Sequence, residues 1–261
     1  MFRSLSAAST GMQAQQTKLD VTANNIANVS TAGFKKSRAE FSDLMYQTMR
    51  QPGATTGDGT QAPTGLQVGM GVRTAASQRM HSQGDLRQTG NSLDVAIEGR
   101  GFYPVEKPDG QTAYTRDGAL KLDGEGRIVT SEGFPIAGQI TIPPDAQSVT
   151  IAANGTVSVT VPGDAAPSEV GQIQVATFAN PAGLESLGRN LLAETAASGT
   201  ATLGPAGENG AGSLAQGTLE LSNVKVVEEM IDLIAGQRAY EVNTKVIRAA
   251  DEMLAQTANV R

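Results

Sequence analysis

The chain has 261 residues, no cysteine and one histidine, His81, and its 26 acidic residues outnumber its 20 basic ones to give a formal charge of -6. The lack of cysteine excludes disulfides, cysteine-ligated metals and thiol nucleophiles, and a single histidine excludes a histidine-rich metal site. The acidic balance argues against a nucleic-acid binder, and no apolar run approaches the roughly 20 residues that span a membrane, so we expect neither nucleic-acid binding nor membrane insertion.

Both ends of the chain are predicted to be helical. All 11 prolines lie between Pro52 and Pro205, so the ends lack the strongest helix breaker. An apolar residue recurs every seven positions near each end, as in coiled coils. The two rows are Leu5, Met12, Leu19 and Ile26, and then Val226, Leu233, Tyr240, Ile247 and Leu254. The second row of each helix is weaker, so we predict a helix pair that gains its remaining burial from other chains.

The middle of the chain is predicted to be antiparallel β-structure over about 96–205, which makes the fold α+β. Apolar and polar residues alternate over 157–161, and shorter runs occur at 95–97, 120–122 and 140–142. Turn pairs that suit tight hairpins punctuate the region. They are Asp109-Gly110, Asp117-Gly118, Asp123-Gly124 and Asn154-Gly155. The stretches 51–65 and 198–212 are predicted to be irregular.

Candidate chemistry is scarce. Gly69-Met70-Gly71 lacks the third glycine of a dinucleotide fingerprint, and His81 in a polar stretch is better explained as a hydrogen-bonded side chain than as a general base. The segment 123–126 lacks the ligand ladder of a calcium loop and is predicted to be a hairpin turn. We therefore predict no catalytic, cofactor or metal site, and no enzyme.

An asparagine-rich segment ends the first predicted helix. Asn24, Asn25 and Asn28 are poor helix formers, so their amides are expected to bridge to another backbone. Gly33 is predicted to cap this helix in the left-handed conformation, with Phe34 packing back onto its last turn.

This segment, 24–35, resembles the N-terminal signature of the bacterial flagellar rod and hook proteins, Asn-Asn-(Ile/Leu)-Ala-Asn-Val-x-Thr-x-Gly-Phe-Lys. Segments 237–243 and 251–254 resemble the matching C-terminal signature. Within the family, segments 43–54 and 65–69 resemble subunits of the distal rod, and the resemblance continues at 81–84 and 113–118.

The resemblance implies three domains. Residues 1–35 and 223–261 would form a coiled-coil domain that lines a channel, and 36–95 with 206–222 a linking β-rich domain. Within the linking domain, 46–65 would be a rod-specific insertion. Residues 96–205 would form an outer β domain.

The resemblance also implies the function and its partners. The chain would be a structural subunit of the distal rod, without cofactor, that polymerises into a rigid hollow helical tube. The tube would transmit torque from motor to hook, span the periplasm and conduct exported subunits. Expected partners are further copies of the chain, proximal rod proteins, the hook protein, the P- and L-ring proteins and the flagellar type III export apparatus, through which it would leave without a cleaved signal peptide.

The predicted site is an assembly interface. Its helical core is predicted to comprise Leu5, Met12, Leu19, Asn24, Asn25, Ile26, Asn28, Phe34, Val226, Leu233, Tyr240, Ile247 and Leu254. The insertion is represented by Tyr46, Gln51, Pro52, Gly53, Pro63 and Gly65. Gln15, Gln237 or Asp251 is expected to face the channel and keep it wet.

Three other interpretations remain open. A proximal rod or hook-type subunit is the nearest, and segment 43–69 speaks against it only by resemblance. A secreted adhesin or binding module would not need matched heptads at both ends. A secreted hydrolase would need paired carboxylates or a triad in a cleft.

Overall fold

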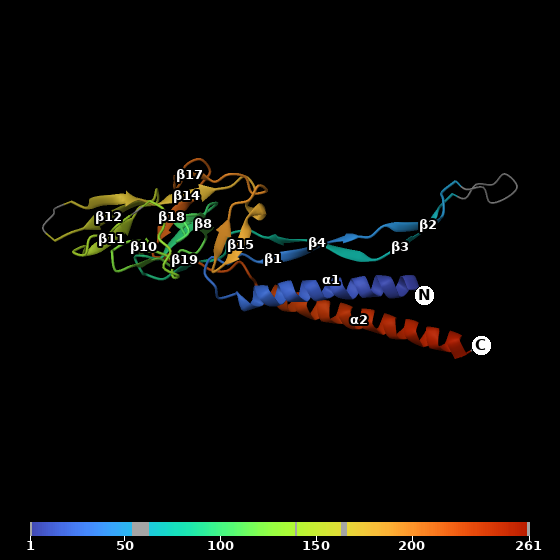
Figure 1. Ribbon diagram of the computed structural model, residues 1–261. Coiled ribbons are helices and arrows are strands. Elements are labelled where there is room, and N and C mark those ends of the chain that lie inside the picture. Colours follow the sequence, from blue (N-terminus) through green and yellow to red (C-terminus); the bar gives the residue numbers. More distant parts are fainter. Residues whose placement is uncertain (1, 54–62, 139, 163–165, 260–261) are drawn as a thin grey trace. The chain divides into compact units, whose positions relative to one another are not determined.

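The computed structural model describes residues 2–53, 63–138, 140–162 and 166–259, and the chain forms two compact units (Figure 1). Unit 1 comprises Met1–Ala27, Ser37–Gln78 and Lys225–Arg261, and unit 2 comprises Asn28–Lys36 and Arg79–Val224. The α+β class with a helix at each end is confirmed.

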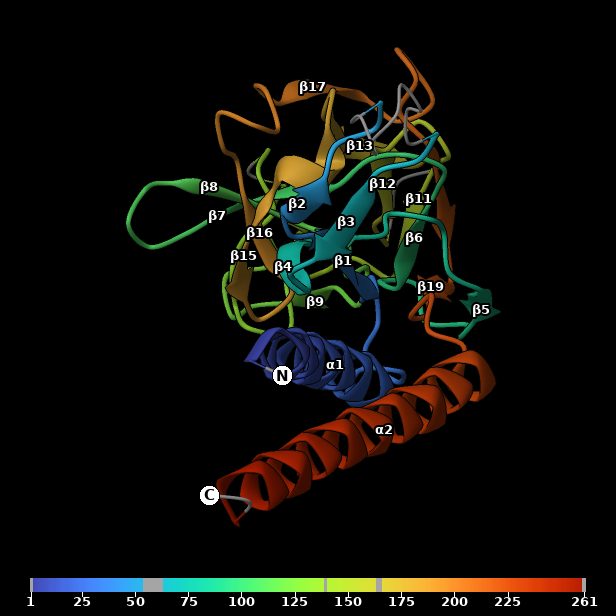
Figure 2. The same ribbon diagram turned by 90° about the vertical axis from the view of Figure 1, so that its right-hand side faces the viewer.

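Unit 1 contains the two long helices, α1 (Phe2–Ala27) and α2 (Val226–Asn259), which pack against each other (Figures 1 and 2). Strand β1 (Ser37–Asp43) contacts α1 and pairs with β4 (Val72–Arg79). Strands β2 (Tyr46–Arg50) and β3 (Leu66–Gly69) form an antiparallel pair.

Unit 2 is built from short strands. In chain order they are β5 (Leu86–Gln88), β6 (Val95–Glu98), β7 (Tyr103–Glu106), β8 (Thr112–Thr115), β9 (Lys121–Leu122), β10 (Ile128–Val129), β11 (Ser148–Ile151), β12 (Thr156–Thr160), β13 (Ser168–Gln172), β14 (Gln174–Thr177), β15 (Glu185–Gly188), β16 (Leu191–Ala193), β17 (Thr202–Pro205), β18 (Ser213–Gln216) and β19 (Thr218–Glu220), with a 3₁₀ turn, η1, at Pro181–Gly183.

The strands of unit 2 pair antiparallel in several small sheets. The largest has the order β15-β16-β8-β7, and a second has the order β11-β12-β13. Two-stranded pairs join β14 to β17, β18 to β6, β19 to β5 and β10 to β9. The expected antiparallel middle region is therefore confirmed.

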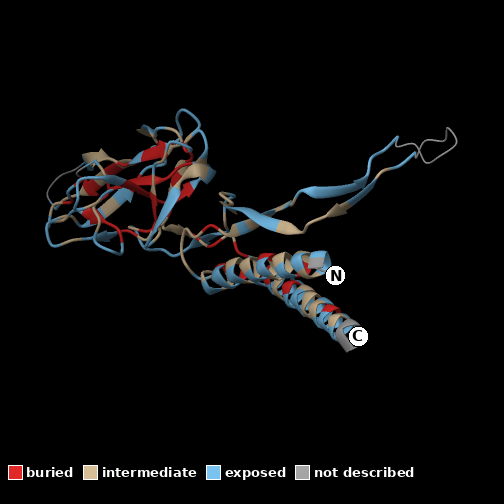
Figure 3. Cartoon of the chain, turned by 45° about the vertical axis from the view of Figure 1, so that its right-hand side comes forward, coloured by how far each residue is buried: buried red, intermediate tan, exposed pale blue. Residues whose placement is uncertain are grey.

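The buried core lies mainly among the strands of unit 2, while most helix residues are half-buried or exposed (Figure 3). Strand β12 follows the predicted alternation, because Val157 and Val159 are buried and their neighbours are only partly so. Val95, Ala96 and Ile97 are instead all buried, so β6 is covered on both faces. Leu120 joins the core, whereas Leu122 is 42% exposed.

Three local predictions are wrong or incomplete. Asp117-Gly118 makes no hairpin turn; the chain continues into a bridge between Asp94 and Ala119, and a Cβ on Gly118 would lie 1.9 Å from the Val95 carbonyl oxygen. Helix α1 ends at Ala27, so Gly33, although left-handed with φ of 67°, is not its cap.

One stretch predicted to be irregular, 198–212, contains a strand. Residues 202–205 form β17, which a local pattern containing Gly204 and Pro205 does not indicate. Tyr46–Arg50, the start of the expected insertion, forms β2. Residues 54–62 of that insertion lie outside the described residues.

Candidate assembly surface and buried polar networks

The predicted row on α1 lies half-buried: Leu5, Met12, Leu19 and Ile26 are each neither fully covered nor exposed. On α2, Leu233, Ile247 and Leu254 are half-buried as well, while Val226 is 40% and Tyr240 42% exposed. Among the asparagines, Asn25 is buried, Asn28 half-buried and Asn24 exposed, and Phe34, in unit 2, is half-buried.

Small and polar residues, which the heptad rows did not single out, lie where α1 and α2 approach each other closely. A Cβ on Gly11 would lie 3.1 Å from Asn243 Nδ2, and one on Gly236 would lie 2.9 Å from Leu19 Cδ2. Glycine within a helix costs about 1 kcal/mol relative to alanine, so two mid-helix glycines were a signal of close packing. An exposed ion pair of 2.8 Å between Lys18 and Asp232 also joins the helices, but such pairs contribute little energy.

Asn25 connects three elements of unit 1. Its Nδ2 donates to the Ser37 carbonyl oxygen at 2.9 Å and to Glu229 Oε2 at 3.0 Å, and its Oδ1 accepts from the Ser37 N–H at 2.9 Å. Asn25 is 2% exposed and Glu229 is 5% exposed. The expected bridge from an asparagine amide to another backbone is confirmed here, within the chain, where it joins α1, β1 and α2.

A buried charge network lies in unit 2. Glu220, 2% exposed at the end of β19, accepts hydrogen bonds from Lys35 Nζ through Oε1 and from Arg116 Nε through Oε2, the latter at 2.6 Å. The Gly84 N–H also donates to Oε1 at 2.8 Å, and Lys35 Nζ donates to the Ser82 carbonyl at 2.8 Å. Burial favours the neutral acid, but Arg116 and Lys35 outweigh it and hold the pKa of Glu220 below its usual range.

Arg116 also orders the turn after β6. Its Nη1 donates to the Gly101 carbonyl at 2.6 Å, and its Nη2 donates to the carbonyls of Ile97 and Gly99, both at 2.7 Å. All three guanidinium nitrogens therefore donate hydrogen bonds. Gly33 lies against the backbone of Arg116, where an added Cβ would be 2.7 Å from the Arg116 carbonyl. Glycine is therefore required at position 33 both for this close approach and for its positive φ.

Asn223, which no sequence pattern singled out, joins the same region. Its Oδ1 accepts from the Lys36 N–H at 2.7 Å, and its Nδ2 donates to the Met80 carbonyl at 2.8 Å. Segments near 35, 80 and 220 are thus held together by polar side chains contacting backbone.

The comparisons with known proteins cover both ends and the middle of the chain. The family models that match are "Flagella basal body rod protein" over 5–35, "Flagellar hook protein FlgE/F/G D1 domain" over 96–159 and "Flagellar basal body rod FlgEFG protein C-terminal" over 215–260. The flagellar basal-body rod protein FlgG of Buchnera aphidicola subsp. Schizaphis graminum is 50% identical over 254 residues, which covers 97% of this chain and 98% of the relative. FlgG of Caulobacter vibrioides is 48% identical over 261 residues, with 100% of each chain covered. FlgG of Bacillus subtilis is 42% identical over 269 residues, again with 100% of each covered.

The chain belongs to the FlgG family of flagellar basal-body rod proteins. It is a structural subunit of the distal rod, and the family is not one of enzymes. The distal-rod interpretation is therefore confirmed over a proximal rod or hook-type subunit. No helix in the described part of the chain is long and apolar enough to cross a membrane.

The networks explain three segments that resembled the family. The first matched region reaches Lys35, and segments 81–84 and 113–118 supply Ser82, Gly84 and Arg116. These segments are far apart in the sequence, but their residues meet around the Glu220 carboxylate.

His81 is half-buried and has a polar atom, Nδ1, that is buried without a hydrogen-bond partner in the described structure. Its ring lies edge-on to Phe102, with centroids 5.5 Å apart. Burial, reinforced by the nearby cations Arg79, Lys35 and Arg116, lowers the pKa of His81 to about 4. The imidazole is therefore neutral at pH 7.

This shift predicts acid sensitivity. Unfolded histidine takes up its proton near pH 6.5, whereas folded His81 resists until about pH 4. Stability should therefore fall by roughly 3 kcal/mol as the pH drops from 6.5 to 4, and become independent of this group below that. Urea unfolding of wild type and His81→Gln across this range checks it. Equal slopes for the two proteins between pH 6.5 and 4 would contradict the prediction.

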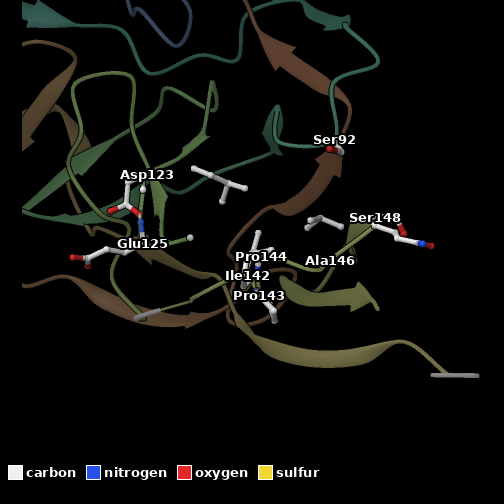
Figure 4. Close-up of a pocket in the computed structure, with 13 residues that line it drawn as sticks. Ser92, Asp123, Glu125, Ile142, Pro143, Pro144, Ala146 and Ser148 are labelled. Carbon is white, nitrogen blue, oxygen red and sulfur yellow. Dashed lines mark hydrogen bonds between the residues drawn. The ribbon is translucent and has the colours of Figure 1, made fainter. Parts of the chain in front are cut away.

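The 123–126 segment forms the turn between β9 and β10, as predicted. Asp123 Oδ1 accepts from the N–H groups of Glu125 and Arg127, both at 2.9 Å, and these bonds help to hold the pKa of Asp123 below its usual range. A cavity of about 420 Å³ lies beside the turn, across which Pro143 and Pro144 are seen (Figure 4). The carboxylate is thus engaged by its own turn, and no cluster of potential metal ligands occurs among the described residues.

The start of the expected insertion is exposed. On the β2–β3 pair, Tyr46 is 55%, Met49 57% and Leu66 50% exposed. Gln51, Pro52 and Gly53 follow β2 as exposed residues, and Pro63 and Gly65 precede β3. A Cβ on Gly65 would lie 2.8 Å from the Arg50 carbonyl oxygen, so the strand ends approach closely at this point.

Proposed function

We propose that the chain polymerises head-to-tail into a rigid, hollow helical tube that transmits torque from motor to hook. The observation that carries this proposal is the incomplete burial of α2 in the single subunit. Large apolar side chains remain exposed along it, among them Val227 at 71%, Ile231 at 62% and Ile234 at 54%. Contiguous apolar surface of this kind marks an interface in a protein that otherwise buries its core. A contact between different faces of successive copies extends as an open helix when its rotation does not close into a ring.

In this proposal the terminal helices form a coiled-coil domain, 1–35 with 223–261, around the channel. The interface residues are the thirteen predicted above, from Leu5 to Leu254. Gln237 and Asp251 are exposed and Gln15 is half-buried on the lone subunit, so they remain candidates for the channel wall. Residues 36–95 with 206–222 would link this domain to an outer one at 96–205.

The proposed partners follow from the place of the family in the flagellum. They are other copies, proximal rod proteins, the hook protein and the surrounding P- and L-ring proteins. The subunit would reach the periplasm through the type III export apparatus without a cleaved signal peptide, and would carry no catalytic activity.

Electron microscopy of basal bodies from cells that lack this chain tests the proposal. We expect the inner ring to be retained and the distal rod and hook to be lost. Complete rods with hooks in such cells would overturn it. Restoring the wild-type chain from a plasmid controls for effects on neighbouring genes.

Deleting residues 46–65 should give a more flexible or curved rod. The apolar side chains of β2 and β3 are exposed in the lone subunit, and we propose that they order against adjacent subunits and stiffen the tube. The curvature of purified rods in electron micrographs measures this effect. A deletion variant whose rods are as straight and stiff as wild type would reject a stiffening role for the insertion.

A further inference from the structure

A second cavity in unit 2, of about 600 Å³, lies beside His81. Its lining includes Arg100, Phe102, Thr177, Phe178 and Thr202. The rings of Phe102 and Phe178 meet edge-to-face with centroids 5.8 Å apart, and His81 meets Phe102 at 5.5 Å. One wall of the cavity is therefore aromatic.

One buried polar atom beside this cavity lacks a hydrogen-bond partner among the described residues. The imidazole of His81 is hydrogen-bonded to the backbone of Pro181, while its buried Nδ1 finds no partner in the described structure. Because the ring is neutral at pH 7, Nδ1 is an acceptor that lacks a donor. A buried acceptor left in this state is costly, so this imidazole is a polar group that the fold itself does not satisfy.

The charge of the cavity is positive. Arg100 is exposed, makes no ion pair with any described residue, and no carboxylate lies among the described residues of the lining. Arg79, Lys35 and Arg116 are close enough to His81 to lower its pKa, and of these only Lys35 and Arg116 share the carboxylate of Glu220. The cavity thus suits a peptide that brings an apolar side chain and a carboxylate.

The chain itself carries such a segment at the end of β1. Met45 is 85% exposed, the largest exposed fraction among the large apolar side chains that the structure describes. The exposed carboxylate of Asp43 precedes it by two residues. A thioether is flexible and contacts aromatic rings favourably, which fits the Phe102 and Phe178 wall.

We propose that Met45 of a second copy of the chain inserts into the cavity beside His81, and that Asp43 of that copy pairs with Arg100. This inference rests on the proposed polymerisation and assigns one of its contacts. The occupied cavity would add one apolar anchor and one charge pair to each subunit contact.

Disulfide trapping tests the contact. Because the chain has no native cysteine, only the introduced cysteines can form a disulfide between copies of the chain. Cells produce two chains together, one with Met45→Cys and the other with Thr202→Cys, and isolated rods are oxidised. We expect a linked dimer of the two chains, and none from either chain alone. The matched control replaces Thr112, an exposed strand threonine of the same unit outside the cavity lining, by cysteine, and should give no dimer with Met45→Cys.

Charge reversal supplies an independent readout. Arg100→Glu and Asp43→Lys should each slow polymerisation roughly tenfold, and the double variant should recover most of the wild-type rate. If wild-type rods form but no dimer is trapped and both single reversals are neutral, this inference fails while the proposed function stands. If the wild-type chain forms no polymer at all, the proposed function itself fails.

Discussion

Replacing Glu220 by glutamine should destabilise unit 2 by about 3–5 kcal/mol. Glutamine keeps the size of the side chain but removes its charge. Lys35 and Arg116, 5% and 6% exposed at their side chains, would then stay buried without a counter-charge. Removal of one partner from a buried ion pair is among the most costly single changes, because the remaining charge is not solvated.

Urea unfolding of the purified chain measures this loss. Two of its four tyrosines, Tyr103 and Tyr114, are buried in unit 2, so near-ultraviolet circular dichroism reports on that unit in a chain without tryptophan. Glu185→Gln, an exposed strand glutamate of the same unit, is the matched control and should change stability by no more than about 0.5 kcal/mol.

A double variant separates charge from packing. Lys35→Met added to Glu220→Gln removes one of the two uncompensated cations, so it should recover part of the lost stability. Lys35→Met alone is the second single variant. If the losses of Lys35→Met and Glu220→Gln simply add in the double variant, the network contributes through shape alone. Glu220→Gln within about 1 kcal/mol of wild type would contradict the charge argument.

The helices and the alternating strands could be predicted because their signals are local. Proline-free ends and a seven-residue apolar row predict α1 and α2, and β12 alternates as its sequence does. Strand β17 was missed because its stability comes from pairing with β14, residues 174–177, which are distant in the sequence. Local propensity carries no record of such a partner.

The polar networks show the same limit. Lys35, Arg116 and Glu220 lie far apart in the chain, and no spacing rule connects them. A resemblance marked segments 24–35 and 113–118 as belonging to one family, but gave no reason for their residue types. The structure supplies that reason, since the segments converge on one buried carboxylate.

The asparagines illustrate the same limit. Asn24, Asn25 and Asn28 are poor helix formers, and this pattern predicts a bridge from a side-chain amide to another backbone. It did not identify which asparagine makes the bridge, nor that the partner would be Ser37, only 12 residues along the same chain. The tight return of the chain from α1 to β1 brings the two together.

Replacing Asn25 by alanine should destabilise unit 1 by about 2–4 kcal/mol. The change leaves the Ser37 N–H and carbonyl without the amide and removes one donor from the buried Glu229 carboxylate. Alanine is the better helix former, which offsets only about 0.7 kcal/mol.

An exposed residue of the same helix outside the proposed interface offers a control. Gln16 is exposed on α1, so Gln16→Ala should be neutral or slightly stabilising. Amide exchange monitored by mass spectrometry reports the loss where it is expected, as lower protection at the end of α1 and the start of β1. Because α1 and α2 bury little in the lone subunit, few other contacts can compensate for the lost hydrogen bonds of Asn25. Cells that carry Asn25→Ala should therefore assemble fewer complete rods and swim less than cells with Gln16→Ala. Equal protection and motility in the two would show that the hydrogen bonds of Asn25 are dispensable.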